Sequence, residues 1–136
     1  MNQTQIVLDS CVVIDVIEKP KIASRLKASL RGKSVKIVLC DTVLSEVYRV
    51  RGYIAQYVIS KISKILGRDI ELSAMGDDNL AITITNQFQI CHNGDNKILS
   101  LCQSKNFVLI TFDRMLLKTC QFVGVAAFHP FMVRGI

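Results

Sequence analysis

Phe107-Val108-Leu109-Ile110-Thr111-Phe112-Asp113 is the stretch that decides the fold of this 136-residue chain. It is an apolar run that ends in a hydroxyl, an aromatic ring and a carboxylate, and residues 5–9 and 35–40 contain similar apolar runs. Strands that are apolar on both faces are typical of a parallel sheet that is buried on both sides. The stretch therefore predicts an α/β fold with a central parallel sheet.

Amphipathic segments separate these apolar runs and are predicted to be helices. The predicted strands span 5–8, 35–40, 107–111 and 123–128, and the predicted helices 11–18, 21–30, 42–51, 53–66, 95–105 and 113–119. Thr42 is expected to cap the helix that it starts. Residues 79–89 are predicted to form a helix, although the run Ile82-Thr83-Ile84-Thr85 favours a strand. Helices that alternate with parallel strands cover both faces of the sheet, so a three-layer α/β/α architecture is expected.

Length and cysteine usage narrow the class of protein. A chain of 136 residues predicts a single domain spanning 1–136. The five cysteines are an odd number and form no C-x-x-C motif, which argues against a disulfide framework and a zinc ribbon. No signal peptide or membrane span is recognisable, so we expect a cytoplasmic protein without membrane contact.

The charge balance is basic. Lysines and arginines outnumber aspartates and glutamates by 17 to 11, and seven of the 17 lie between Lys19 and Lys36. A net charge of +6 suits a polyanionic partner such as nucleic acid, although a solvated basic helix face is the simpler explanation of the run. The sequence contains no basic motif interleaved with aromatic residues, so base stacking is not predicted.

Four carboxylates lie at predicted strand ends or near helix starts, where parallel α/β folds bind their ligands. Asp9 and Asp113 follow predicted strands, Asp95 opens a predicted helix, and Glu46 lies one turn inside another. Each has a structural alternative when taken alone. Asp9 and Asp95 could be helix caps, and Glu46 could pair with Arg49 at the i,i+3 spacing.

Carboxylates that share one cleft raise one another's pKa, and a hard divalent cation resolves that repulsion. Mg²⁺ or Mn²⁺ suits such a set of oxygen ligands, whereas zinc favours histidine and cysteine. Such a cation can activate a water molecule, orient a phosphodiester and neutralise charge on the leaving oxygen. Neither of the two histidines is needed for this chemistry, and no partner can be identified for His129.

The order of these residues resembles a known family. The motifs that carry the resemblance are Ile6-Val7-Leu8-Asp9-Ser10, Leu44-Ser45-Glu46-Val47, Gly94-Asp95 followed by Ile98-Leu99-Ser100-Leu101-Cys102, and Val108-Leu109-Ile110-Thr111-Phe112-Asp113. Together they resemble the PIN-domain ribonucleases, and the small VapC-like toxins most of all. The resemblance runs from about Ile6 to Pro130, and Thr-x-Asp after the late strand is its most specific part.

The resemblance implies a PIN-like fold and assigns roles to individual residues. It makes Asp9, Glu46, Asp95 and Asp113 the catalytic, metal-binding acids, and it gives Ser10 and Thr111 supporting hydroxyls. Two positions depart from the family pattern. Cys11 stands where the family usually has Asn, and Leu116 stands where a further acid is common.

The function implied by the resemblance is a Mg²⁺- or Mn²⁺-dependent endoribonuclease, in which water attacks the RNA phosphodiester and leaves 5′-phosphate and 3′-hydroxyl ends. It also implies a toxin that pairs with a small antitoxin and forms a homodimer. The basic residues nearest the acids in sequence, Arg49, Arg51, Lys97 and Arg114, are then expected to contact RNA. The apolar face of residues 53–66 is expected to contact a partner protein, with burial in the core as the alternative.

Three other functions are conceivable for such a chain, and the sequence argues against two of them. An aspartyl phosphatase needs Asp-x-Asp after the first strand, whereas this chain has Asp9-Ser10-Cys11. A receiver domain needs an acidic pair and a late lysine at spacings that are absent here. A non-catalytic RNA-binding or scaffold PIN domain remains the alternative, because Cys11 departs from the pattern of the nucleases.

Overall fold

The computed structural model describes residues 3–74 and 95–136, and the predicted helix at 79–89 lies outside them. Within these residues, five strands form one parallel sheet in the order β3-β2-β1-β4-β5. The strands are β1 (Thr4–Leu8), β2 (Val35–Cys40), β3 (Ile70–Ser73), β4 (Val108–Ile110) and β5 (Ala127–Phe128). The helices are α1 (Ser10–Glu18), α2 (Pro20–Ser29), α3 (Asp41–Arg51), α4 (Ala55–Leu66), α6 (Asp95–Lys105) and α7 (Arg114–Val123).

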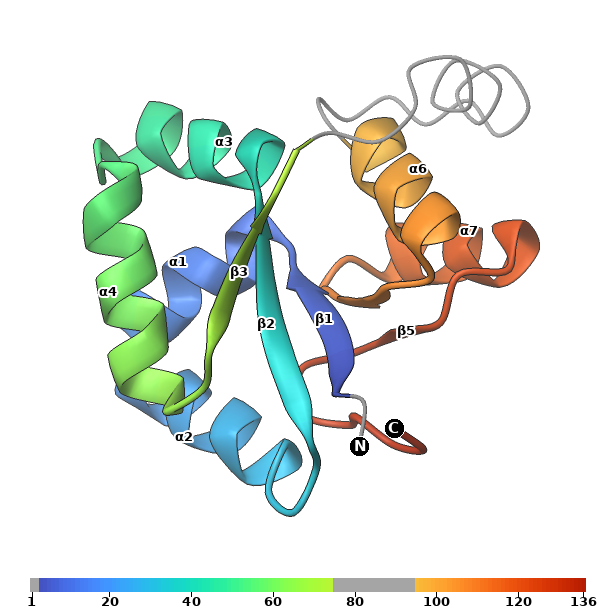
Figure 1. The fold of residues 1–136 in the computed structure, drawn as a ribbon, viewed down its shortest axis with the longest axis horizontal. Helices are drawn as coiled ribbons and strands as arrows, with labels where there is room; N and C mark the ends of the chain where they lie inside the picture. The colour runs from blue at the N-terminus through green and yellow to red at the C-terminus, as the bar shows by residue number, and fades with distance from the viewer. Residues whose placement is uncertain (1–2, 75–94) are drawn as a thin grey trace.

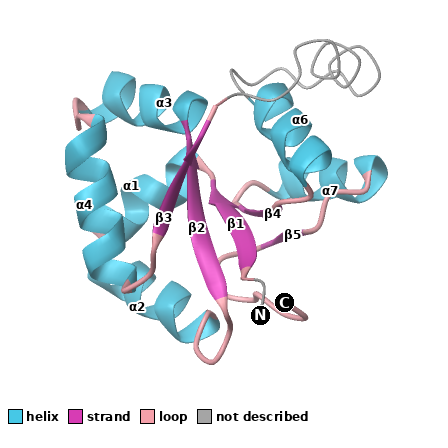
Figure 2. Ribbon diagram, in the orientation of Figure 1, coloured by secondary structure: helices cyan, strands magenta, loops and turns pink. Residues whose placement is uncertain are grey.

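The helices cover the sheet from two sides. Helices α1 to α4 pack on one another on one side, and α6 and α7 lie on the other (Figures 1 and 2). This arrangement confirms the α/β fold with a parallel sheet between helices. No helix in the described ranges is long and apolar enough to span a membrane.

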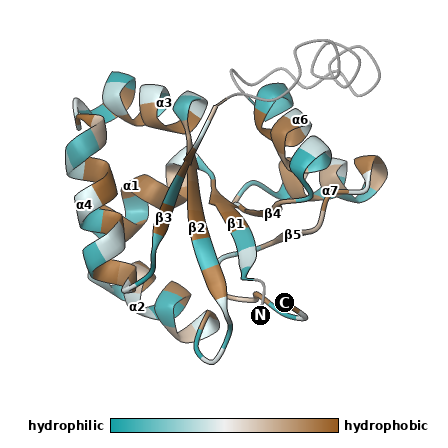
Figure 3. Cartoon of the chain, in the orientation of Figure 1, coloured by the Kyte–Doolittle hydropathy of each residue, from teal (hydrophilic) through white to brown (hydrophobic). Residues whose placement is uncertain are grey.

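The core explains why the strands were recognisable in the sequence. Ile6, Val7 and Leu8 of β1 are completely buried, as are Ile37 and Val38 of β2, because helices cover both faces of these central strands. Along α4, hydrophobic and hydrophilic residues alternate, so that Val58, Ile62 and Leu66 enter the core (Figure 3). Burying both faces of a strand requires the unbroken apolar run from which it was predicted.

Several element boundaries differ from the prediction. The helix expected at 53–66 begins at Ala55, because Gly52 ends α3 in the left-handed region at φ 74°. The helix expected at 113–119 continues to Val123, so the strand expected at 123–128 is reduced to Ala127–Phe128.

Two further expectations were incomplete or wrong. Strand β3 was not predicted; it is a four-residue edge strand whose Glu71 accepts hydrogen bonds from Gln5 Nε2 at 2.9 Å. Thr42 does not cap α3, which begins at Asp41, and the Thr42 hydroxyl is buried without a hydrogen-bond partner.

Candidate active site

The four predicted acids line one pocket at the carboxyl edge of the sheet. Asp9 directly follows β1, Asp113 follows β4, Glu46 lies on α3 and Asp95 opens α6. The pocket measures about 320 Å³, and its lining comprises Asp9, Ser10, Cys11, Glu46, Arg49, Asp95 and Asp113. We call it the acid pocket. Segments from both halves of the chain therefore bring their carboxylates to one place, as the parallel topology requires.

Asp9 is buried and receives three hydrogen bonds. The backbone N–H of Ser10 donates to its Oδ1 at 2.8 Å. The Thr111 hydroxyl donates to Oδ2 at 2.8 Å, and the Cys11 thiol lies 3.6 Å from the same oxygen. Burial raises the pKa of Asp9 above its ordinary value, and the charge of Glu46 adds to the rise, whereas the hydrogen bonds from Thr111, Ser10 and Cys11 lower it. Burial dominates this balance, so the pocket disfavours a bare negative charge on Asp9.

The two predicted supporting hydroxyls contact the acids. Ser10 Oγ donates to Glu46 Oε1 at 2.9 Å, which ties α3 to the start of α1. Thr111 Oγ1 also accepts a hydrogen bond from the backbone N–H of Asp113 at 3.1 Å. Thr111 is therefore a bridge between two acids that lie 104 residues apart in the sequence.

Asp9 has the capping role that was its structural alternative, and Asp113 caps a helix as well, which was not predicted. Asp113 Oδ1 accepts from the N–H groups of Met115 and Leu116 at 2.9 and 3.2 Å and so caps α7. Asp9 is the residue at the N-cap of α1. Capping and ligand binding are compatible here, because each carboxylate has a second oxygen that does not cap the helix.

The donor types fit a hard divalent cation. Among the described residues, the acid pocket offers carboxylate and hydroxyl oxygens and no histidine, and burial with the nearby charge of Asp9 raises the pKa of the Cys11 thiol to about 12. Cys11 is thus a neutral thiol, which makes the pocket a poor zinc site. As the side chains lie, no three His, Cys, Asp or Glu residues in the described part of the chain are close enough together to hold a metal ion. Closing the set around an ion would require side-chain rotation.

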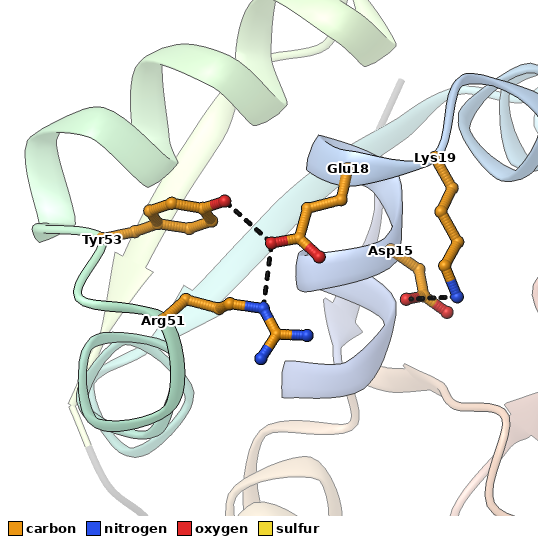
Figure 4. Close-up of polar contacts among 5 residues, drawn as sticks. All are labelled: Asp15, Glu18, Lys19, Arg51 and Tyr53. Atoms are coloured by element: carbon orange, nitrogen blue, oxygen red, sulfur yellow. Dashed lines mark hydrogen bonds and ion pairs between the residues drawn. The ribbon is translucent and has the colours of Figure 1, made fainter.

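The four basic residues expected to contact RNA lie in different places. Arg49 lines the acid pocket, and Arg114 is exposed directly after Asp113. Lys97 is half-buried on α6. Arg51 instead contacts α1: its Nε donates to Glu18 Oε2 at 2.9 Å, and Tyr53 donates to the same oxygen at 2.8 Å (Figure 4).

Glu18 accepts both hydrogen bonds of this contact. Its pKa is lowered by the hydrogen bonds from Tyr53 and Arg51, and Asp15 on the same helix pairs with Lys19 at 3.4 Å (Figure 4). Arg51 is therefore occupied by a helix-to-helix contact.

A larger pocket lies at the opposite edge of the sheet, where the strands begin. It measures about 770 Å³ and is lined by Gln3, Thr4, Gln5, Lys36, Lys105, Asn106, Phe107, Val108 and Ala126. None of these described lining residues is a carboxylate or a predicted site residue. Ligands in parallel α/β folds bind at the carboxyl edge, so the smaller acid pocket is the candidate active site.

Sequence reasoning missed a cluster of rings beside the acid pocket. Phe112, His129 and Phe131, which we call the aromatic group, have ring centroids 4.9 to 5.7 Å apart. Arg25 of α2 lies over the Phe131 ring at 3.7 Å from its centroid. These residues come from three distant segments, so no local sequence motif could predict the cluster. The sequence contains no basic motif interleaved with aromatic residues, and this contact between Arg25 and Phe131 forms only in the fold.

Comparison with known proteins identifies the family. A profile described as PIN domain matches residues 6–121. The chain belongs to the PIN domain family. A comparison with curated protein sequences gave no match.

Solved structures similar to this PIN domain include two VapBC complexes. VapBC-1 from nontypeable Haemophilus influenzae is 18% identical with a TM-score of 0.64, and the match covers 93% of this chain and 98% of the other. VapBC2 from Rickettsia felis, bound to a DNA fragment from its promoter, gives the same four values. A PilT N-terminus domain protein from Sulfolobus solfataricus is 15% identical over 93% of this chain and 87% of the other, with a TM-score of 0.59. At these identities the likeness concerns the fold.

Proposed function

We propose that this PIN domain is a Mg²⁺- or Mn²⁺-dependent endoribonuclease and the toxin of a cytoplasmic toxin–antitoxin pair. The observation that carries the proposal is that Asp9, Glu46, Asp95 and Asp113, from four separate segments, line one pocket. Membership of a family whose members are typically nucleases supports the same function. The similarity to VapBC complexes supports the pairing with an antitoxin.

In this proposal the four carboxylates hold the cation. When bound, the ion would supply an activated water molecule and neutralise charge on the leaving oxygen. Ser10 and Thr111 keep Glu46 and Asp9 in place through hydrogen bonds of 2.9 and 2.8 Å. Hydrolysis joins the water oxygen to phosphorus and breaks the bond to the 3′ oxygen, which leaves 5′-phosphate and 3′-hydroxyl ends.

The cations near the acids would bind the substrate. Arg49 lines the pocket itself, and Arg114 follows Asp113 at the start of α7. Arginine binds phosphate through two parallel N–H donors, so either residue can hold the RNA strand beside the acids. Lys97 on α6 completes this set, whereas Arg51 is left out because Glu18 occupies it.

Exposed apolar side chains on α3 and α4 support a partner surface. Tyr48, Ile54 and Tyr57 are 58%, 56% and 40% exposed, respectively. The apolar face predicted at 53–66 is thus divided, because Val58 and Ile62 are buried in the core while Ile54 and Tyr57 face outward. We propose that the outward part contacts a second copy of the chain in a homodimer and, next to it, the apolar face of an antitoxin helix.

Incubation of the purified chain with end-labelled RNA tests the enzymatic proposal. We expect cleavage with Mn²⁺ or Mg²⁺ and none with a chelator, and we expect the products to carry 5′-phosphates. Asp9→Asn and Asp95→Asn should each abolish cleavage without loss of folding. The matched control is Asp15→Asn, because Asp15 pairs with Lys19 outside the pocket and its variant should keep full activity.

Two outcomes would contradict the proposal. Cleavage by the Asp9→Asn/Asp95→Asn double variant at the rate of the unaltered chain would show that the acid pocket is not the active site. Metal-independent RNA binding without cleavage by the unaltered chain would favour the non-catalytic alternative, in which Cys11 replaces the usual Asn.

A further inference from the structure

The aromatic group lies at the same edge of the sheet as the acid pocket. Phe112 stands between Thr111, which donates to Asp9, and Asp113, which lines the pocket. His129 directly follows β5, and its ring centroid is 5.2 Å from that of Phe112. The rings therefore lie at the edge of the sheet that carries the acid pocket, and Phe112 is the sequence neighbour of Asp113, which lines it.

Arg25 packs on the Phe131 ring of this group, and this contact orients its guanidinium. Its guanidinium carbon lies 3.7 Å from the Phe131 centroid, a separation at which the guanidinium face packs on the ring face. Packing through the face leaves the N–H donors, which lie in the guanidinium plane, directed outward. Among residues 3–74 and 95–136, the ion pairs involve Lys19, Lys36 and Arg51, and neither Arg25 nor Arg114 has a carboxylate partner.

His129 adds a neutral N–H donor to this group. The N–H of Phe131 donates to His129 Nδ1 at 3.1 Å, so the neutral ring carries its proton on Nε2. Burial lowers the pKa of His129, and the positive charges of Arg25 and Arg114 lower it further. Arg25 lies over Phe131, whose ring centroid is 4.9 Å from that of His129. Arg114 follows Phe112 by two residues, and the Phe112 ring centroid is 5.2 Å from that of His129.

Space for a ligand lies beside Arg25. A pocket of about 400 Å³ is lined by Pro20, Lys21, Ser24 and Arg25. The surface of this pocket is mostly apolar, so the donors to an anion are the N–H groups of Arg25 rather than the pocket wall. An anion with several acceptor oxygens is the ligand that fits outward N–H groups and a neutral His N–H.

We propose that Arg25, Arg114 and His129 form a binding site for phosphates of single-stranded RNA next to the acid pocket, with Phe131 positioning Arg25. The inference rests on the proposed nuclease function and adds to it the path of the strand outside the pocket. Phe131 is a positioning residue, because it acts through Arg25.

Fluorescence anisotropy with a 5′-labelled oligouridylate in a chelating buffer tests this site. Arg25→Gln and Arg114→Gln should each weaken binding about tenfold, as expected when a charge-assisted hydrogen bond is lost. The double variant should reduce the slope of log affinity against log salt by about 1.4, since each phosphate contact contributes about 0.7 on single strands. The matched control is Arg31→Gln, which removes the same charge from an exposed arginine beyond the end of α2.

Two conservative variants separate orientation from charge. Arg25→Lys keeps the charge and loses the planar fork, and Phe131→Leu keeps apolar bulk and loses the ring. Both should weaken binding several-fold with little change in the salt slope, and in cleavage assays they should raise KM while kcat stays unchanged.

The possible outcomes distinguish this site from the nuclease proposal itself. If the unaltered chain cleaves RNA and the Arg25 and Arg114 variants bind it as tightly as Arg31→Gln does, the phosphate site is refuted and the nuclease function stands. A lower melting temperature of Phe131→Leu at full RNA affinity would also refute it, because the rings would then only fasten the C-terminal segment to α2. If the unaltered chain neither binds nor cleaves RNA, both proposals fail.

Discussion

Replacing Thr111 by valine tests whether the hydroxyl bridge between Asp9 and Asp113 stabilises the site and the fold. Thr111 is completely buried, and its hydroxyl donates to Asp9 at 2.8 Å and accepts from the Asp113 N–H at 3.1 Å. A hydrogen bond to a charged group contributes about 1.5–3 kcal/mol and a neutral one about 0.5–1.5 kcal/mol. Burial of the additional methyl group of valine stabilises the folded state by about 1 kcal/mol and offsets part of this loss. We therefore expect a loss of about 2 kcal/mol in the free energy of unfolding, or roughly 6–10 °C in Tm.

Thr42→Val is the matched control. The Thr42 hydroxyl is also buried, but it has no hydrogen-bond partner. Removing an unpartnered buried hydroxyl should leave stability unchanged or raise it by about 1 kcal/mol. Urea denaturation of both variants in the presence of a chelator measures the difference. A Thr111→Val protein as stable as the Thr42→Val protein would refute the reasoning.

The pH dependence of the Thr111→Val effect gives an independent check. The Thr111 hydrogen bond lowers the pKa of Asp9, so its loss should raise that pKa further above the ordinary value. A raised pKa in the folded state means that stability is lost as the pH rises through it. The destabilisation should thus be largest at neutral pH and should shrink as Asp9 becomes protonated. A destabilisation that grows on acidification would contradict the assignment of Asp9 as the charged partner.

Three further predictions concern the metal, a surface contact and the partner. Mn²⁺ at ten times its Kd should raise the Tm by roughly 3–6 °C, equivalent to about 1.4 kcal/mol, and Asp113→Asn should lose most of that shift, as thermal melts at matched ionic strength would show. Glu18→Gln should leave cleavage unchanged and should flatten the loss of stability in acid, because a lowered folded-state pKa contributes stability that disappears as the pH falls through it. Tyr57→Glu should weaken self-association in sedimentation experiments, because it places a charge on an exposed apolar surface.

Specific results would contradict each of these. Identical Mn²⁺ shifts in Asp113→Asn and the unaltered chain would mean that no ion binds at Asp113. An unchanged acid profile of Glu18→Gln would mean that Tyr53 and Arg51 do not hold this carboxylate in solution. A Tyr57→Glu protein that dimerises as strongly as the unaltered chain would place the dimer contact elsewhere.

The central part of the fold could be predicted because its physical requirements are local. Strands β1 and β2 are buried on both faces, which demands the continuous apolar runs that the sequence displays. Strand β3 was not predicted because it is an edge strand of only four residues, none of which is fully buried. The end of α7 was misplaced because Gly124, which ends the helix at φ 76°, lies beyond an apolar stretch that suits a strand equally well.

The candidate site could be predicted only as far as order along the chain reports on position in space. Parallel strands place their ends together, so Asp9 and Asp113 could be expected at one edge. The partners of surface cations do not follow from spacing, because Arg51 meets Glu18 from a different helix. The aromatic group could not be predicted for the same reason, since Arg25 and Phe131 are separated by most of the chain.

The capping of α1 by Asp9 and of α7 by Asp113 has an electrostatic consequence for the acid pocket. The aligned peptide dipoles of a helix place about half a positive charge at its N-terminus, so two helices direct their positive ends toward these carboxylates. Part of the mutual repulsion of the acids is therefore offset by the backbone before any cation arrives. Asparagine keeps this capping geometry while removing the charge, whereas alanine would lose both. At these two positions, asparagine variants report on the ligand charge, and alanine variants report on helix initiation as well.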